Sequence, residues 1–256
     1  MNSIKTLLIL TKMDFKKRYL GTMLGTVWAL LMPLVTIALI YVVLRYGLRL
    51  SGVVGTVSFV DWLVAGMLAW FFVSEGLGSG VGVIMDYPYL VTKMKFPVRL
   101  LIPARLCAAM PVHFLLMIIF MLVLAFGENR PFLCWLQLPY YFFCACVLVF
   151  SITIFTCAAQ VFIRDIANVV GVFLQIFFWV TPLFWDPAFV KDTPFSVMLY
   201  SPFNYIVSGY RDALVHGVNF WNKPFETLFF WVATAICFYI GYKVFKRSRP
   251  HFADVL

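Results

Sequence analysis

Long runs of apolar residues follow one another along most of this chain. Five of them contain no Asp, Glu, Lys or Arg, and a sixth, Trp62–Met85, contains only Glu75. Each is close to or above the roughly 20 residues that an α-helix needs to cross a bilayer core. The five uncharged runs are Val27–Leu44, Leu106–Phe126, Phe132–Ile163, Ile166–Trp185 and Thr227–Tyr242. In water they would expose more apolar surface than one core hides, so the pattern predicts an all-α polytopic membrane protein with six transmembrane helices.

The stretch between the fifth and sixth apolar runs differs from the others. Thr193–Tyr210 is uncharged, but Pro194, Pro202 and Asn204 interrupt it, and a crossing here would move the basic C-terminal residues to the outer side. Non-helical backbone at membrane depth survives only where protein or water satisfies its hydrogen bonds. We therefore predict that residues 186–226 form short re-entrant helices that act as a periplasmic gate. The candidate gate residues are Pro202, Asn204 and Arg211.

Charge is scarce and unevenly distributed. Hydrophobic residues make up 63% of the chain and charged residues 12%, with a mean hydropathy of +0.95, whereas a soluble domain has about 25% charged residues. Lys and Arg beside membrane spans are kept on the cytoplasmic side, so the net charge of +9 does not indicate a nucleic-acid partner. With six spans and the N-terminus inside, fourteen of the twenty Lys and Arg fall on the inner side. Both termini are therefore predicted to be cytoplasmic.

The six cysteines and one intramembrane histidine show no pattern that favours disulfides, metal binding or ligand binding. The cysteines lie almost entirely in apolar runs, with no CxxC pair and no nearby His cluster. This pattern favours small apolar side chains over disulfides and predicts no metal site. His113 stands alone in the third apolar run, where a lone His more often forms a hydrogen bond between helices than binds a ligand.

The first 22 residues have an amphipathic pattern. On a helical wheel, apolar side chains gather on one side and lysines on an adjacent stripe. The apolar set is Ile4, Leu7, Leu8, Thr11 and Phe15, and the lysine stripe is Lys5, Lys12 and Lys16. Two interpretations stay open. The segment is a basic flank that anchors the first span, or it is a helix lying on the cytoplasmic surface, where Lys16, Lys17 and Arg18 face anionic lipid headgroups.

Glycines four residues apart predict close helix contacts at two places. Gly21 and Gly25 precede the first span, and Gly76 and Gly80 lie in the second. Glu75 stands next to the second pair and is costly to bury in a membrane, so it needs a partner. It is interpreted either as an acid hydrogen-bonded at a tightly packed helix interface or as a substrate ligand.

The loop between the second and third spans is predicted to form a short amphipathic helix. Asp86 is a candidate cap, Pro88 lies in the first turn and Pro97 ends the segment. A helix of this kind suits insertion into a groove of a partner protein, whereas the alternative is an ordinary basic loop that only sets the topology. The candidate coupling residues are Tyr87, Tyr89, Leu90, Lys93, Met94 and Lys95.

Three blocks resemble a known family. Arg18–Pro33 is similar to the first-span motif of ABC-2 type exporter permeases, which move polysaccharides and glycolipids. Arg164–Ile166, followed by Gly171–Trp179 and Thr181-Pro182, resembles the O-antigen branch of that family. Ser201–Tyr205 and Tyr210–Leu214 resemble the stretch before the last span, although Ser-Pro stands here in place of the commoner Asn-Pro.

The resemblance implies a permease subunit of an ATP-driven exporter of lipid-linked polysaccharide in the bacterial inner membrane. The sequence has no GxxxxGK[ST] phosphate loop, so ATP and Mg²⁺ are expected on a separate ATPase subunit, with no cofactor or catalytic residue in this chain. The resemblance further implies a homodimer with two ATPase copies, and a coupling helix in the loop before Pro97. The single transmembrane domain would comprise an interface helix (1–22), spans one to five (23–185), the gate (186–226), span six (227–245) and a cytoplasmic tail (246–256).

Aromatic residues form 19% of the chain, and most of the Trp and Tyr near span ends are expected to form membrane-interface belts. A minority that flanks the family motifs is expected to line the pathway. These candidates are Trp28, Tyr41, Phe177, Phe178 and Trp179. Capsular polysaccharide and teichoic-acid exporters remain alternatives within the family. A secondary transporter is the alternative from another class, but it would need several intramembrane ionisable groups and two related halves.

Overall fold

Helices make up nearly all of the structure. The computed structural model describes residues 3–19, 25, 27–47, 49, 53–54, 57–92, 97–126 and 131–256. The α-helices are α1 (Ser3–Tyr19), α2 (Val27–Val42), α3 (Phe59–Gly80), α4 (Pro88–Thr92), α5 (Leu101–Ala125), α6 (Leu138–Phe162), α7 (Ile166–Val180), α8 (Pro202–Arg211), α9 (Pro224–Ser248) and α10 (Phe252–Val255). Short 3₁₀ or π segments are η1 (Val43–Gly47), η2 (Val98–Leu100), η3 (Phe132–Gln137), η4 (Pro187–Val190), η5 (Pro194–Tyr200), η6 (Asp212–His216), η7 (Phe220–Asn222) and η8 (Arg249–His251).

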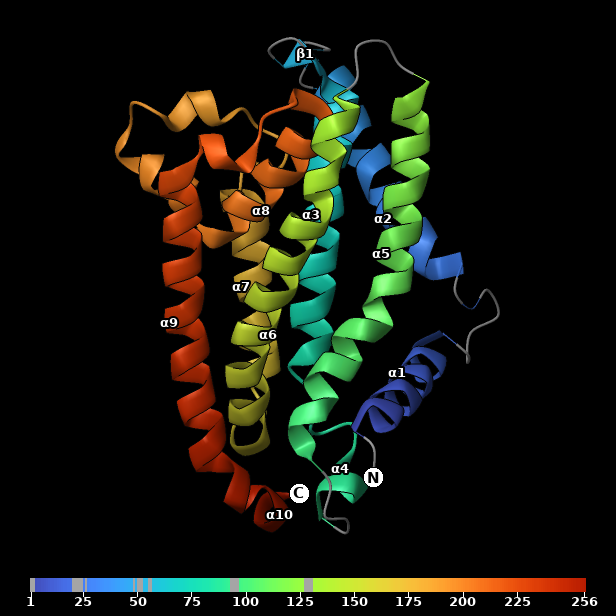
Figure 1. The fold of residues 1–256 in the computed structure, drawn as a ribbon, viewed down its shortest axis with the longest axis vertical. Coiled ribbons are helices and arrows are strands. Elements are labelled where there is room, and N and C mark those ends of the chain that lie inside the picture. Colours follow the sequence, from blue (N-terminus) through green and yellow to red (C-terminus); the bar gives the residue numbers. More distant parts are fainter. Residues whose placement is uncertain are drawn as a thin grey trace.

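Five helical segments within the described residues are long and apolar enough to cross a membrane. They are Val27–Gly47, Phe59–Gly80, Val98–Ala125, Phe132–Phe162 and Pro224–Val255. α7 is apolar but has only 15 residues, about 22 Å of helix, and lies upright in the same bundle (Figure 1). The chain is therefore an all-α polytopic membrane protein, and the sixth crossing, by α7, stays a prediction.

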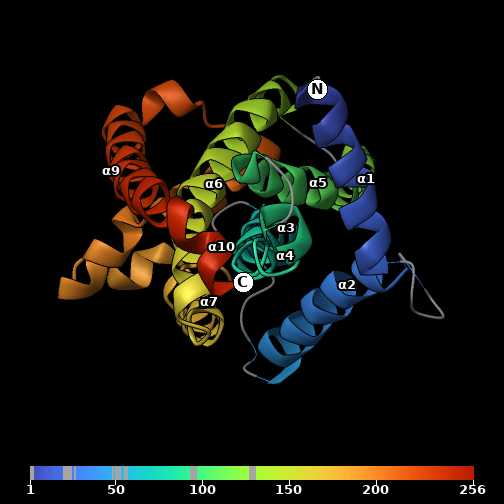
Figure 2. The same cartoon turned by 90° about the horizontal axis from the view of Figure 1, so that it is seen from below.

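α3 is the central helix of the bundle. It packs against α5, α6, α7 and α8, and a view along the bundle axis places it in the middle (Figure 2). Its contact with α6 depends on two glycines. A Cβ on Gly76 would lie 2.7 Å from Val149 Cγ1, and one on Gly80 would lie 2.7 Å from Thr153 Cγ2. Any larger residue at these positions would force the Val149 or Thr153 side chain to shift, because real Cβ atoms do not approach other atoms so closely.

The two ends of the bundle differ. Both chain termini lie at one end with α1, α4 and α10, which we call the inner end (Figure 1). The outer end carries an antiparallel hairpin, β1 (Val53–Val54) with β2 (Val57–Ser58), which the all-α prediction did not include. Residues 186–226 also lie toward the outer end and fold into η4, η5, α8, η6 and η7 before α9 begins at Pro224. Each is too short to cross a bilayer.

α1 lies beside α5 at the inner end and turns a mixed face inward. Thr6, Leu10 and Asp14 are buried, whereas Ile4 and Leu8 are exposed. The predicted apolar face therefore points partly away from the protein, as expected for a helix on a membrane surface. The inward face contains a carboxylate that the helical-wheel reading overlooked.

The C-terminal residues fold back under the bundle. α9 continues to Ser248, and α10 then lies against α4 and α6. Phe252 is buried, with its ring 5.7 Å from that of Phe245 and 6.1 Å from that of Phe162. The predicted tail is thus packed onto the helix expected to dock a partner.

Candidate functional site

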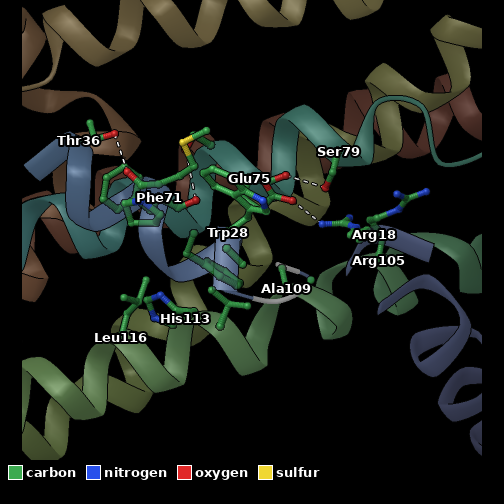
Figure 3. Close-up of a pocket in the computed structure, with 17 residues that line it drawn as sticks. Arg18, Trp28, Thr36, Phe71, Glu75, Ser79, Arg105, Ala109, His113 and Leu116 are labelled. Atoms are coloured by element: carbon green, nitrogen blue, oxygen red, sulfur yellow. Dashed lines mark hydrogen bonds and ion pairs between the residues drawn. The ribbon is translucent and has the colours of Figure 1, made fainter. Parts of the chain in front are cut away.

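A cavity of about 650 Å³ lies between α2, α3 and α5, and we call it the inner cavity (Figure 3). Its lining on α5 runs from Arg105 to Leu116, about 16 Å along the helix. Trp28 of α2 and Phe71 of α3 contribute aromatic walls, and Gly25, whose φ is +50°, borders it before α2 begins. α2 has no buried residue in this chain, so one wall of the cavity is weakly packed.

The charges of the inner cavity gather at its inner end. Arg18 of α1 donates a hydrogen bond to Glu75 of α3 across the cavity mouth (Figure 3). The Glu75 side chain is 51% exposed, so it is paired but not enclosed in a tight helix interface. The prediction that Glu75 needs a partner is confirmed, and its partner is one of the three cations expected to face lipid headgroups.

Deeper in the cavity, His113 forms the interhelical hydrogen bond that the sequence predicted. Its Nε2 lies 2.9 Å from the hydroxyl oxygen of Tyr210 on α8. The imidazole also stacks on Phe142 at 5.4 Å between ring centroids. The inner cavity is therefore joined through a buried polar contact to the segment predicted to form the outer gate.

The three predicted headgroup residues occupy different environments. Lys16 is exposed, and within the described part of the chain no ion pair involves it. Lys17 Nζ lies 3.6 Å from Asp86 and 5.2 Å from the centre of the Tyr87 ring. Arg18 is mostly buried, and its Nε lies 3.2 Å from Asp14 Oδ2. The three side chains do not form one exposed basic cluster.

The predicted coupling segment begins as a helix at Pro88. Asp86, expected to cap this helix, instead directs its carboxylate to Arg105 and Lys17. Tyr89 is 61% exposed, whereas Leu90 packs into a cluster of this chain's own side chains that includes Phe252. α4 ends at Thr92, and Lys93, Met94 and Lys95 lie outside the described residues.

Tyr87 stands between the coupling segment and α1. Its hydroxyl donates a hydrogen bond to Asp14 Oδ1 at 3.1 Å. Burial, followed by the nearby Asp14 carboxylate, raises the pKa of Tyr87 to about 12. The phenol therefore stays protonated at neutral pH and remains a hydrogen-bond donor.

The other predicted pathway and packing residues fall into separate groups. Trp28 lines the inner cavity, but Tyr41, Phe177 and Phe178 pack partly buried against the main core. Trp179 is 61% exposed on the outside of α7. Gly21 lies outside the described residues. Of the five aromatic candidates, only Trp28 lines the inner cavity.

The predicted gate residues lie at the outer end, where the Arg211 side chain forms hydrogen bonds with two other segments of the chain. Its guanidinium donates to Trp62 O at 3.0 Å, Pro182 O at 2.6 Å and Leu183 O at 2.7 Å, and it covers the Trp62 ring at 3.4 Å. These contacts join α8 to the start of α3 and to the turn after α7. Gly66 makes room for it, because a Cβ there would lie 2.5 Å from Arg211 Nη2.

Pro202 and Asn204 shape the start of α8. Pro202 is its first residue, and the Ser201 side chain caps it by accepting from Phe203 N. Asn204 donates to Leu199 O at 2.7 Å and borders a second, outer cavity of about 840 Å³. Charged side chains of this outer cavity include Lys223, which pairs with Asp212.

Sequence reasoning missed the roles of Asp14 and Arg105. Asp14 is the one acidic residue among the basic residues of α1, and its spacing of four from Arg18 was the available signal. Arg105 was counted only as an inner charge, yet it is a buried member of α5. Its pairing with Asp86 bridges 19 positions and has no local pattern.

A polytopic bundle of membrane-length helices with an open cavity between them is the architecture of a membrane transport component. Residues 5–215 match the family model of the ABC-2 type transporter, and the chain belongs to that family.

Two similar proteins carry the same printed name, O-antigen export system permease protein RfbA. The one from Klebsiella pneumoniae is 22% identical over 252 residues, which cover 98% of this chain and 94% of the relative. The one from Myxococcus xanthus is 28% identical over 195 residues, covering 73% of this chain and 70% of the relative.

Proposed function

We propose that this protein is the membrane-spanning permease subunit of an ABC exporter that moves lipid-linked O-antigen across the bacterial inner membrane. Family membership over residues 5–215 and the names of the similar proteins support this proposal. The observation that carries it is the inner cavity, with an apolar and aromatic wall along the bundle and an Arg–Glu pair at its inner mouth. A lipid-linked glycan combines an apolar tail, an anionic headgroup and sugar rings. The wall suits the tail and the sugar rings, and Arg18 at the mouth suits the headgroup.

The inner end is assigned to the cytoplasm, so both termini and α4 face the ATP-containing side. The excess of Lys and Arg predicted for that side supports the assignment. Lys16 and Lys17, which are exposed, would then meet the anionic headgroups of the inner leaflet, where each such cation contributes about 1 kcal/mol, whereas Arg18 would meet a headgroup only at the mouth of the inner cavity.

A second copy of this chain would complete the pathway. α2 presents a row of exposed apolar side chains, and it closes one side of the inner cavity with few contacts of its own. A partner on this face would bury that surface and stabilise the wall. We therefore infer a homodimer in which Trp28 and its surroundings face a shared pathway.

ATP hydrolysis is assigned to a separate subunit that docks on α4. The sequence lacks a phosphate loop, and Tyr89 offers an exposed aromatic side chain on a short helix at the inner end. Such a helix suits a groove on the ATPase. This chain would act as a transport component without a catalytic step of its own.

Reconstitution tests the proposal directly. The permease and its ATPase are placed in proteoliposomes loaded with a fluorescent polyprenyl-pyrophosphate O-antigen oligosaccharide in the leaflet facing the ATPase. ATP should move the glycan to the other leaflet, and a hydrolysis-deficient ATPase should not. Transport of capsular or teichoic-acid carriers alone would contradict the O-antigen assignment, and transport driven by an ion gradient without ATP would contradict the exporter class.

A further inference from the structure

Asp14 is a buried carboxylate at the centre of a network of charges. Its side chain is 3% exposed, on a helix whose lysines are exposed to solvent. Oδ2 lies 3.2 Å from Arg18 Nε, and Oδ1 lies 3.3 Å from Arg105 Nε. Oδ1 also accepts the hydrogen bond from Tyr87. The contacts with the two arginines are ion pairs without a direct hydrogen bond, and the loss of any one partner would leave a buried charge or dipole unpaired.

Each arginine that binds Asp14 also binds a second acid. Arg18 reaches Glu75 at the mouth of the inner cavity, and Arg105 reaches Asp86 just before α4. The two guanidiniums therefore share Asp14 and extend in different directions. The result is a continuous chain of ion pairs from the cavity wall on α3, through α1 and α5, to the segment that leads into α4.

The ends of this chain of ion pairs are more exposed than its middle. The side chains of Arg18 and Arg105 are 12% and 7% exposed, whereas those of Glu75 and Asp86 are 51% and 39% exposed. Glu75 and Asp86, at the two ends of this chain of ion pairs, can therefore exchange their arginine partners for solvent, an anionic solute or another protein. Asp14, in the middle, is 3% exposed and contacts both arginines, so the two outer ion pairs share one buried carboxylate.

We infer that Asp14 is a positioning residue that couples occupancy of the inner cavity to the placement of Tyr87 and α4. This inference rests on the proposed function, in which α4 meets the ATPase. An anionic headgroup that competes with Glu75 for Arg18 would shift the Arg18–Asp14–Arg105 arrangement and, through Asp86 and Tyr87, the docking helix.

The test uses the complete permease–ATPase complex in proteoliposomes with the fluorescent polyprenyl-pyrophosphate oligosaccharide. Asp14→Asn keeps the side-chain size and an acceptor for Tyr87 but removes the charge shared by the arginines. We expect basal ATP hydrolysis to persist, stimulation by the glycan to disappear, and the glycan moved per ATP to fall about tenfold. Asp254→Asn, the same change at a 75% exposed carboxylate of the inner end, should leave all three measurements unchanged.

A double-mutant cycle separates a linked path from independent sites. The readout is the glycan moved per ATP, about a tenth of which is expected to remain in Asp14→Asn. If Glu75 acts through Asp14, Glu75→Gln should reduce this ratio in the wild-type background and have little further effect in the Asp14→Asn background. Effects that simply add would overturn the inference. Normal stimulation and normal glycan moved per ATP in a well-inserted Asp14→Asn complex would overturn it as well.

A milder variant keeps the test possible if Asp14→Asn does not insert into the membrane. Tyr87→Phe removes only the hydroxyl that contacts Asp14, and we expect the same direction of change at about two- to threefold. Unchanged coupling in that variant would refute the inference. A wild-type complex that shows no ATP-driven export would instead refute the proposed function.

Discussion

Arg211 should be among the side chains on which the outer end depends most. Arg211→Met removes the three hydrogen bonds to backbone carbonyls and the charge over the Trp62 ring. Each such bond from a charged donor contributes about 1.5–3 kcal/mol, but burying a guanidinium has its own cost. The carbonyls of Pro182 and Leu183 remain without this donor, so we expect a net loss of about 3–5 kcal/mol.

Thermal unfolding of the purified permease in detergent measures this loss. For a chain of this size, 1 kcal/mol corresponds to about 2–4 °C, so the midpoint should fall by about 10 °C. Arg247→Met is the matched control, because Arg247 is exposed near the inner end of α9. An Arg211→Met midpoint within about 2 °C of the wild type would refute the reasoning.

Gly66 provides an independent check on the same contact. Gly66→Ala adds a Cβ that would lie 2.5–2.9 Å from the guanidinium of Arg211, and overpacking of this kind costs about 1–3 kcal/mol. In an Arg211→Ala background the added methyl group has room, so the same change should then cost almost nothing. Equal costs in the two backgrounds would show that Gly66 has another role.

Three further predictions concern the inner end. Tyr89→Asp should weaken ATPase binding at least tenfold in a pull-down while the permease melts normally, whereas Leu90→Asp should lower the melting temperature, because Leu90 packs inside this chain. Phe252→Ala should cost about 3–5 kcal/mol of local packing and speed proteolysis of the C-terminal residues, and unchanged proteolysis would contradict the packed position of α10. Lys16→Gln should reduce export modestly without changing the melting temperature. Arg18→Gln should lower export and the melting temperature, and a melting temperature equal to that of Lys16→Gln would contradict the burial of the Arg18 ion pairs.

Much of the fold was predictable because the bilayer restricts what a backbone can do. Long apolar runs of about 20 residues favoured helices, because a helix satisfies its own amides where no water is present. Pro194, Pro202 and the polar residues around them predicted that residues 186–226 would break into short pieces, as they do. Segment bounds were less accurate: α9 begins at Pro224, three residues before the apolar run, and the β1–β2 hairpin had no recognised signal.

The candidate site was only partly predictable, because its contacts join residues that are distant in the sequence. Glu75 was expected to need a partner and His113 to make a helix-to-helix hydrogen bond, but neither partner was identifiable from spacing. Arg211 reaches Trp62 across 149 positions, and Arg18 reaches Glu75 across 57. The sequence by itself determined which segments are helical and which charges are costly to bury. Only the tertiary structure decided which opposite charges meet, because that depends on how the helices are placed side by side.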